Sequence, residues 1–168
     1  MRKLLTLLLL TFSFPAFAQS VLTIDMQQCL WHPDDDPAWA EATLDESDWR
    51  PYSEWKSTPA EGRVWVRCHL DATLLSVLPQ PAIQVRLHAA YQIYFNGSLI
   101  GNSGNLSNGN FTIDGIRAYP ISANLLSAPT ASIALRLRFA SFEMDFLVWE
   151  KKNVDLHEVR ICFVRLRA

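Results

Sequence analysis

The carboxylates in the N-terminal half are the residues of this sequence with the most evident chemical potential. Three consecutive acids, Asp34, Asp35 and Asp36, lie between two prolines. Clustered carboxylate oxygens suit Ca²⁺, so the triplet could form a calcium loop. Its spacing matches no EF-hand, and consecutive acids in a loop are usually just solvated. We therefore predict no metal site.

Two carboxylates at a fixed separation could also hydrolyse a glycosidic bond. The acids of this segment are Asp34, Asp35, Asp36, Asp45, Glu46, Asp48 and Glu54. Nothing in the sequence buries or pairs any two of them, and the G-x-S-x-G, H-E-x-x-H, P-loop and G-x-G-x-x-G motifs are all missing. We predict a non-catalytic protein without a cofactor. A fragment of a glycoside hydrolase is the less favoured alternative.

The tryptophans suggest ligand binding more than the acids do. Five of them fall in the first half of the chain after residue 18: Trp31, Trp39, Trp49, Trp55 and Trp65. Indole faces can stack on pyranose rings while amides and carboxylates take the hydroxyls. The alternative is that they fill the core, which we favour for the first three. Trp55, in a polar loop, and Trp65, on a polar strand face, stay open between the two roles.

The histidines and cysteines give weaker signals. His32, His69, His88 and His157 are scattered, and although His69 and His88 could be neighbours across a sheet, a metal site would need a third ligand. We expect them at the surface or rim. The cysteines, Cys29, Cys68 and Cys162, are odd in number and form no C-x-x-C. In an oxidising compartment Cys29–Cys68 is the pair we would expect to bridge, but three buried thiols are an equal alternative.

The N-terminus predicts export. Residues 1–3 are basic at two positions, residues 4–12 are apolar, and Ala16-Phe17-Ala18 is an A-x-A cleavage site, so we predict a signal peptide over residues 1–18. A retained anchor is the alternative. The whole chain of 168 residues has 15 Lys and Arg against 17 Asp and Glu; removing Arg2 and Lys3 changes the net charge from −2 to −4. This balance argues against nucleic-acid binding, and we expect a periplasmic or extracellular protein.

The hydrophobic pattern predicts strands. Residues 63–70, 83–89 and 133–139 alternate apolar and polar side chains, which is typical of half-buried strands. Residues 91–95 alternate likewise and run into Asn96-Gly97, the signature of a type I′ hairpin turn. We also expect strands over 21–30, 111–119 and 159–166, and helical turns at 37–40, capped by Asp36, and at 71–76. Several short strands between turns indicate an all-β sandwich.

Four motifs occur in a telling order: 35–40, 44–49 (L-D-E-S-D-W), 64–67 (V-W-V-R) and 94–101 (Y-F-N-G-S-L-I-G). Together they resemble the galactose-binding-like jelly roll that serves as the sugar-binding domain of family 2 glycoside hydrolases. They are also similar to the exported N-terminal sensor modules of bacterial histidine kinases and SpoIIE-type phosphatases. The resemblance covers roughly residues 31–139, although the family strand usually has W-Y-R where this sequence has Trp65-Val66-Arg67. It implies no catalytic residue.

We therefore expect a signal peptide (1–18), a jelly-roll β-sandwich (19–145) and a linker or final strand (146–168), either stand-alone or cut from a longer receptor. The expected ligand is a carbohydrate or another small molecule. The candidate contacts are Trp55, Trp65, Arg67, His69, Asn102, Asn105 and Asn108. The alternative is a dimerisation or receptor-contact module whose arginine-bearing sheet face meets another subunit. The arginines are Arg63, Arg67, Arg86, Arg136 and Arg138.

Overall fold

The structure is a computed structural model that describes residues 21–24, 26–55, 62–76, 78, 81–85, 87, 89–111, 117–139 and 159–163. The predicted signal peptide, Arg86, His88, His157 and residues 146–158 of the predicted linker or final strand lie outside these residues. None of the helices in the described part of the chain reaches the length and hydrophobicity that a membrane crossing requires.

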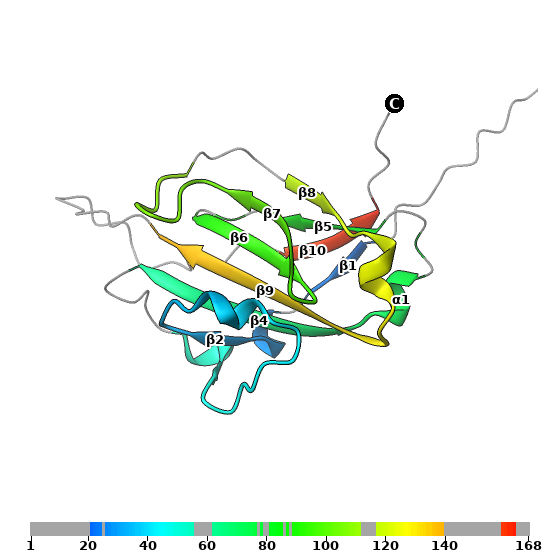
Figure 1. The fold of residues 1–168 in the computed structure, drawn as a ribbon, viewed down its shortest axis with the longest axis horizontal. Helices are drawn as coiled ribbons and strands as arrows, with labels where there is room; N and C mark the ends of the chain where they lie inside the picture. Colours follow the sequence, from blue (N-terminus) through cyan, green and yellow to red (C-terminus); the bar gives the residue numbers. More distant parts are fainter. Residues whose placement is uncertain are drawn as a thin grey trace, which may run out of the picture.

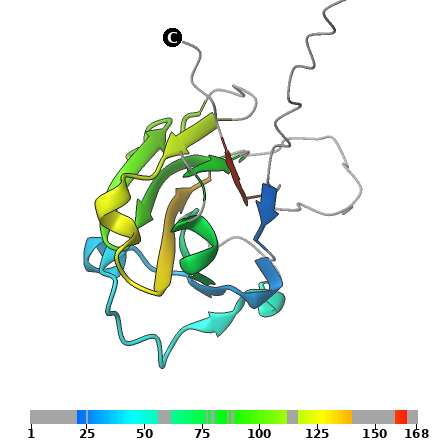
Figure 2. The same ribbon diagram turned by 90° about the vertical axis from the view of Figure 1, so that its right-hand side faces the viewer.

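Two antiparallel sheets pack face to face, as Figures 1 and 2 show, which confirms the predicted all-β sandwich. The six-stranded sheet has the order β3-β2-β4-β9-β6-β7 and the four-stranded sheet the order β1-β10-β5-β8. The strands of the larger sheet are β2 (Leu30–His32), β3 (Arg50–Pro51), β4 (Arg63–Asp71), β6 (Ala90–Phe95), β7 (Ser98–Ser103) and β9 (Thr130–Arg138). Those of the smaller sheet are β1 (Val21–Thr23), β5 (Pro81–Val85), β8 (Arg117–Pro120) and β10 (Val159–Phe163).

Short helical turns connect the strands. They are η1 (Met26–Gln28), η2 (Pro37–Ala40), η3 (Tyr52–Glu54), α1 (Thr73–Ser76) and η4 (Ala123–Leu126). The predicted cap is confirmed, because the Asp36 carboxylate accepts a hydrogen bond from the Ala38 amide at 2.9 Å and Pro37 opens η2.

The core between the sheets follows the alternation of the sequence. On β4 and β9 the side chains of Val64, Val66, Ile133, Leu135 and Leu137 are buried. Because successive strand residues point to opposite faces, this inward set leaves the other set for the outer face. The hairpin joining β6 and β7 turns at Asn96 and Gly97, whose φ values of 47° and 80° confirm the type I′ turn.

One strand prediction needs correction, and two are confirmed within the described residues. The single strand expected over 21–30 is divided into β1 and β2, because η1 turns the chain from one sheet to the other. In the segment expected over 111–119, the described strand begins at Arg117, and residues 112–116 lie outside the described residues. The final strand expected over 159–166 is confirmed at Val159–Phe163, which pairs with β1 and β5; residues 164–166 lie outside the described residues.

Candidate functional site

Residues 33–49, which we call the cover segment, lie across the outer face of the larger sheet (cyan in Figure 1). Their Ala40 and Trp49 form a second small core with Trp65 of β4 and Ala134 of β9. The side chain of Trp65 is 0% exposed and edges against Trp39, 6.4 Å between ring centroids. The cover segment removes this strand face from solvent at Trp65, so Trp65 fills a core, which is one of the two roles left open for it from the sequence; His69 on the same face is 55% exposed.

Asp35 fixes the start of the cover segment. Arg136 of β9 donates two hydrogen bonds to its carboxylate, at 2.6 and 2.8 Å, and the Trp65 indole donates a third at 3.2 Å. Hydrogen bonding from Arg136 lowers the pKa of Asp35 below its ordinary value of 3.8; burial opposes this shift but does not cancel it. Asp35 is thus an ionised anchor between loop and sheet.

Glu46 fixes the far end of the cover segment. Arg67 Nε donates to its carboxylate at 2.6 Å, and His69 Nε2 lies 2.9 Å from the other oxygen. Arg67, which is 0% exposed, also donates to the Trp39 carbonyl at 2.7 Å. Burial alone would raise the pKa of Glu46, but hydrogen bonds from His69 and Arg67 and their charge outweigh it, so the pKa lies below 4.5.

Acidification is expected to loosen the cover segment. The lowered pKa values of Asp35 and Glu46 mean that their stabilising contribution is complete above the ordinary values of 3.8 and 4.5 and is lost as the pH falls through the lower folded-state values. Urea midpoints measured from pH 6 down to about pH 3 test this: the midpoint of the parent chain should fall, and that of Glu46→Gln should start lower and change less. Glu41→Gln is the control, because Glu41 is exposed and its side chain makes no hydrogen bond or ion pair within the described part of the chain; its backbone amide, which donates to the Ala38 carbonyl at 3.1 Å, is kept in the variant. A Glu46→Gln profile parallel to the parent's would contradict the assignment.

A pocket of about 380 Å³ opens beside the Glu46 anchor, on the outer face of the larger sheet. Its polar lining residues are Thr43, His69, Asn96, Asn124, Ser127, Thr130 and Ser132. Its apolar lining residues are Ala42, Leu125, Ala128 and Ala131. The walls thus come from the cover segment, the ends of β4 and β9, the tip of the β6–β7 hairpin and the connection from η4 to β9. A volume of this size lies in the lower range of small-molecule sites.

Asn96 holds the pocket floor together. Its Oδ1 accepts from the Ser132 amide at 2.8 Å, and its Nδ2 donates to the Leu125 carbonyl at 2.9 Å. The turn that the sequence predicts for its backbone therefore also presents its side chain to β9 and η4. His69 and Ser132 face each other across the β4–β9 ladder.

The structure separates the predicted site residues. Of the seven, His69 lines the pocket, and its side chain is 55% exposed. Trp65 and Arg67 are covered and serve the second core and the Glu46 anchor. Trp55 is half-buried and stacks on Trp31 at a centroid distance of 5.3 Å, packed against the main core.

The three predicted asparagines lie on β7 and in the turn after it. Asn105 Oδ1 accepts from the Ser107 amide and Asn108 Oδ1 from the Asn110 amide, at 2.8 and 2.9 Å. These are local turn contacts of the kind that asparagine favours. The side chain of Asn102 is exposed. None of the three is among the described residues that line the pocket.

Sequence reasoning missed most of the pocket. Ser132, Asn124, Ser127 and Thr130 carry no local signal, because strand register and not sequence proximity brings them to His69. Metal binding gains no support: Asp35 binds Arg136, Asp36 caps η2, and no group of three metal-binding side chains occurs among the described residues.

Comparison with known proteins adds evidence on the fold. No protein-family model and no curated sequence matches the chain. Among solved structures, β-glucuronidase 2 of Bacteroides uniformis, covalently bound to cyclophellitol-6-carboxylate aziridine, matches with a TM-score of 0.60 and 16% identity over 86% of this chain and 18% of that one. The fold is a galactose-binding-like β-sandwich.

Two further structures agree. The β-glucuronidase of Bifidobacterium dentium, complexed with coumarin-3-O-glucuronide, matches with a TM-score of 0.54 and 14% identity over 76% of this chain and 21% of that one. A family 2 glycosyl hydrolase of Bacteroides cellulosilyticus matches with a TM-score of 0.52 and 18% identity, over 70% and 17%. At these identities the likeness concerns the fold, and the chain spans less than a quarter of each enzyme.

Proposed function

We propose that the chain is an exported, non-catalytic module that binds carbohydrate or another small ligand, as the sensing part of a receptor. The observation that carries this proposal is the pocket at His69, Asn96 and Ser132 on a galactose-binding-like sandwich. Its lining supplies hydroxyl, amide and imidazole groups, which are the groups that bind sugar hydroxyls. One of the matched structures is complexed with a glucuronide, which adds support for a sugar ligand.

The state of the carboxylates supports a non-catalytic role. A glycosidase needs two carboxyl groups facing one sugar, whereas Asp35 and Glu46 each bind a sheet arginine. A carboxylate held by arginine is a weak proton donor, because its pKa is lowered.

The disulfide supports export. Cys29 and Cys68 are bonded, with a Cα–Cα distance of 4.4 Å, which confirms the pairing that the sequence analysis gave as one alternative. Structural disulfides persist in oxidising compartments. Together with the predicted leader, this favours a periplasmic or extracellular location.

The alternative, dimerisation through the arginine-bearing face, is less favoured. On that face Arg67 binds Glu46, Arg136 binds Asp35 and Arg138 donates to the Leu106 carbonyl at 3.1 Å. Because these three arginines already form hydrogen bonds within the chain, they are less available for contacts with another subunit.

Thermal unfolding against a sugar panel tests the proposal. The full-length chain is expressed with its own leader, purified as the cell processes it, and heated with increasing mono- and oligosaccharides. A ligand that binds only the folded state raises the melting temperature, and at a hundredfold excess over Kd it adds about 2.7 kcal/mol. We expect a saturable rise with at least one sugar and no release of chromophore from aryl glycosides. A flat melting temperature throughout would count against carbohydrate binding.

A further inference from the structure

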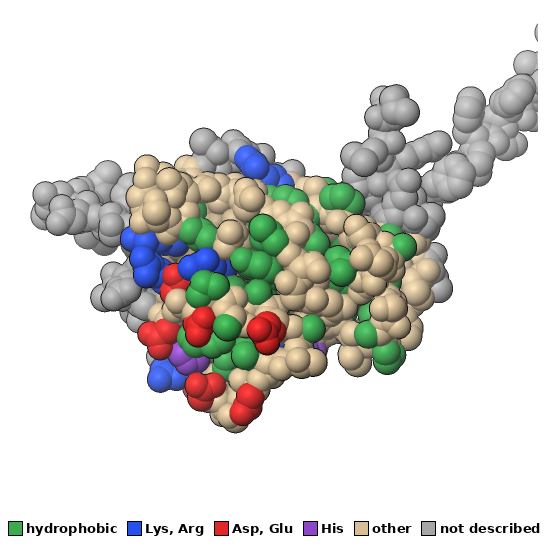
Figure 3. All heavy atoms as spheres, in the orientation of Figure 1, with side chains coloured by type: hydrophobic (Ala, Val, Ile, Leu, Met, Phe, Trp, Pro, Cys, Tyr) green, Lys and Arg blue, Asp and Glu red, His purple; other side chains and the backbone are tan. Residues whose placement is uncertain are grey.

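The pocket is uncharged except for one imidazole. Its described lining contains no Lys, Arg, Asp or Glu and no Trp, Tyr or Phe. Figure 3 shows a similar distribution over the described part of this face: the acidic side chains gather over the cover segment, the basic ones lie there and at the left and upper edges, and the region over η4 and the start of β9 is hydrophobic or uncharged. A ligand here meets hydrogen-bonding groups and small apolar surfaces.

Ser132 carries a buried hydroxyl with which a ligand in the pocket can form a hydrogen bond. It is 5% exposed and lines the pocket, yet its hydroxyl has no hydrogen-bond partner among the described residues. Buried polar side-chain atoms normally have a partner. Removal of the Ser132 hydroxyl therefore breaks no hydrogen bond in the ligand-free protein. A ligand that hydrogen-bonds to this hydroxyl gives a buried polar group the partner that it lacks.

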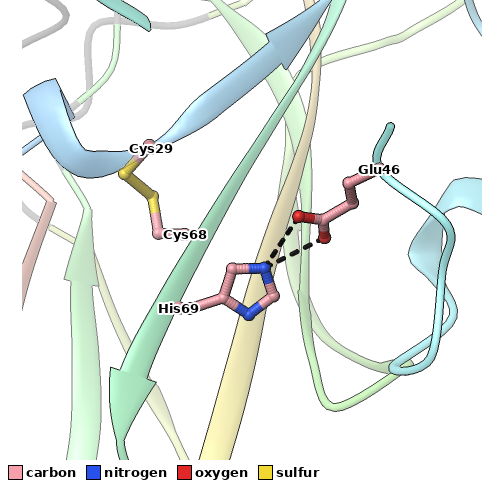
Figure 4. Close-up of a disulfide and its surroundings, with 4 residues drawn as sticks. All are labelled: Cys29, Glu46, Cys68 and His69. Carbon is pink, nitrogen blue, oxygen red and sulfur yellow. Dashed lines mark hydrogen bonds and ion pairs between the residues drawn. A yellow bond between two sulfur atoms is a disulfide. The ribbon is translucent and has the colours of Figure 1, made fainter. Parts of the chain in front are cut away.

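His69 supplies a second group directly opposite. It is the cross-strand partner of Ser132 on the β4–β9 ladder. Its Nε2 is occupied by the Glu46 carboxylate, and Figure 4 shows the other ring nitrogen on the side away from Glu46. When Nε2–H donates to a carboxylate, Nδ1 of the neutral ring is an acceptor for a ligand hydroxyl.

We infer that this pocket binds a neutral polyhydroxyl ligand of monosaccharide size through hydrogen bonds to Ser132 and His69, without an aromatic platform. The inference rests on the proposed carbohydrate function and specifies its site and ligand class. One hydroxyl of the ligand donates to His69 Nδ1, and a neighbouring hydroxyl pairs with Ser132 Oγ. Small apolar contacts come from Ala42 and Leu125.

The same lining selects against an anionic sugar. A uronate carboxylate would need a cation or several donors to replace its hydration, and no Lys or Arg is present in the described lining. Any positive charge on His69 is balanced by Glu46 at 2.9 Å. A uronate therefore loses solvation without gaining an ion pair.

Isothermal titration calorimetry with two matched pairs tests the ligand class. The probes are methyl β-D-glucoside against methyl β-D-glucuronide, and methyl β-D-galactoside against methyl β-D-galacturonide. We expect at least one neutral glycoside to bind at least tenfold more tightly than the uronide that differs from it only at C6.

Ser132→Ala and His69→Phe test the site. Each removes one hydrogen bond to the sugar, so each should weaken binding of the neutral glycoside about fivefold to tenfold. Ser132→Ala should melt at the parental temperature without sugar. Ser53→Ala, the same change at an exposed position in η3, should leave affinity unchanged. His69→Phe provides a second test at a half-exposed position if Ser132→Ala does not fold.

The contrary outcomes are distinct. Tighter binding of a uronide would overturn the ligand class but leave carbohydrate binding standing. Binding that neither variant weakens would overturn the site and likewise leave the function standing. Failure of all four glycosides to bind, together with a flat response to the wider sugar panel, would overturn the inference and the proposed function together.

Discussion

Replacement of Arg67 with alanine is expected to lower the free energy of unfolding by about 3 to 5 kcal/mol, because it breaks a buried ion pair from one side. The Arg67 side chain is 0% exposed, and its partner Glu46 is 15% exposed. Without the guanidinium, Glu46 keeps only His69, and the Trp39 carbonyl loses its donor. The guanidinium also lies over the Trp49 ring, 5.9 Å from the centroid, so truncation removes packing as well as charge.

Urea denaturation followed by tryptophan fluorescence measures the effect. The matched control is Arg50→Ala, because Arg50 is exposed on β3 of the same sheet, its guanidinium lies over the Trp31 ring at 5.7 Å from the centroid, and its backbone pairing with Trp31 is kept in the variant. The control should lose no more than about 1 kcal/mol. Equal losses in the two variants would show that the Arg67–Glu46 pair does not anchor the cover segment.

Removal of the disulfide by the double change Cys29→Ser and Cys68→Ser should cost a similar amount, about 4 kcal/mol. The two cysteines are 39 residues apart in sequence, and a cross-link that closes a loop of this length removes that much entropy from the unfolded chain. The bond ties the start of β2 to β4, and Figure 4 shows it on the opposite side of β4 from His69.

Denaturation with and without a reducing agent distinguishes the stability lost with the disulfide from the stability lost through the serine substitutions themselves. Reductant should destabilise the parent by about as much as the double change does, and it should have little further effect on the double variant. A parent whose stability is insensitive to reductant under unfolding conditions would contradict a structural disulfide.

The sequence predicted those features that depend on neighbouring residues. The type I′ turn at Asn96-Gly97, the Asp36 cap and the inward positions of β4, β6 and β9 follow from local conformation and alternation. The Cys29–Cys68 pair was only one of two alternatives, because spacing does not specify which strands are neighbours.

The sequence did not predict that the outer face of the larger sheet is covered and shielded from solvent. Alternation separates the two faces of β4 but does not say what covers the second one. From the sequence, Arg67 is therefore expected to contact a ligand and Trp65 stays open between a ligand contact and a core position, whereas both are buried beneath the cover segment. A signal was present: tryptophans recur through 31–65 among acids that can bind sheet arginines. The sequence contains no such signal for the four polar pocket residues between positions 124 and 132. They reach the pocket through the antiparallel pairing of β4 with β9, which places Ser132 opposite His69.

The place of β10 in the smaller sheet also bears on the order in which the protein can fold during synthesis. β1 leaves the ribosome before any other described strand, yet its partner in that sheet is β10, which leaves last. Until then β1 and the facing edge of β5 have unpaired backbone groups, and such edges favour aggregation. The smaller sheet can therefore close only once residues 159–163 are available, both during synthesis and during any translocation that begins at the N-terminus.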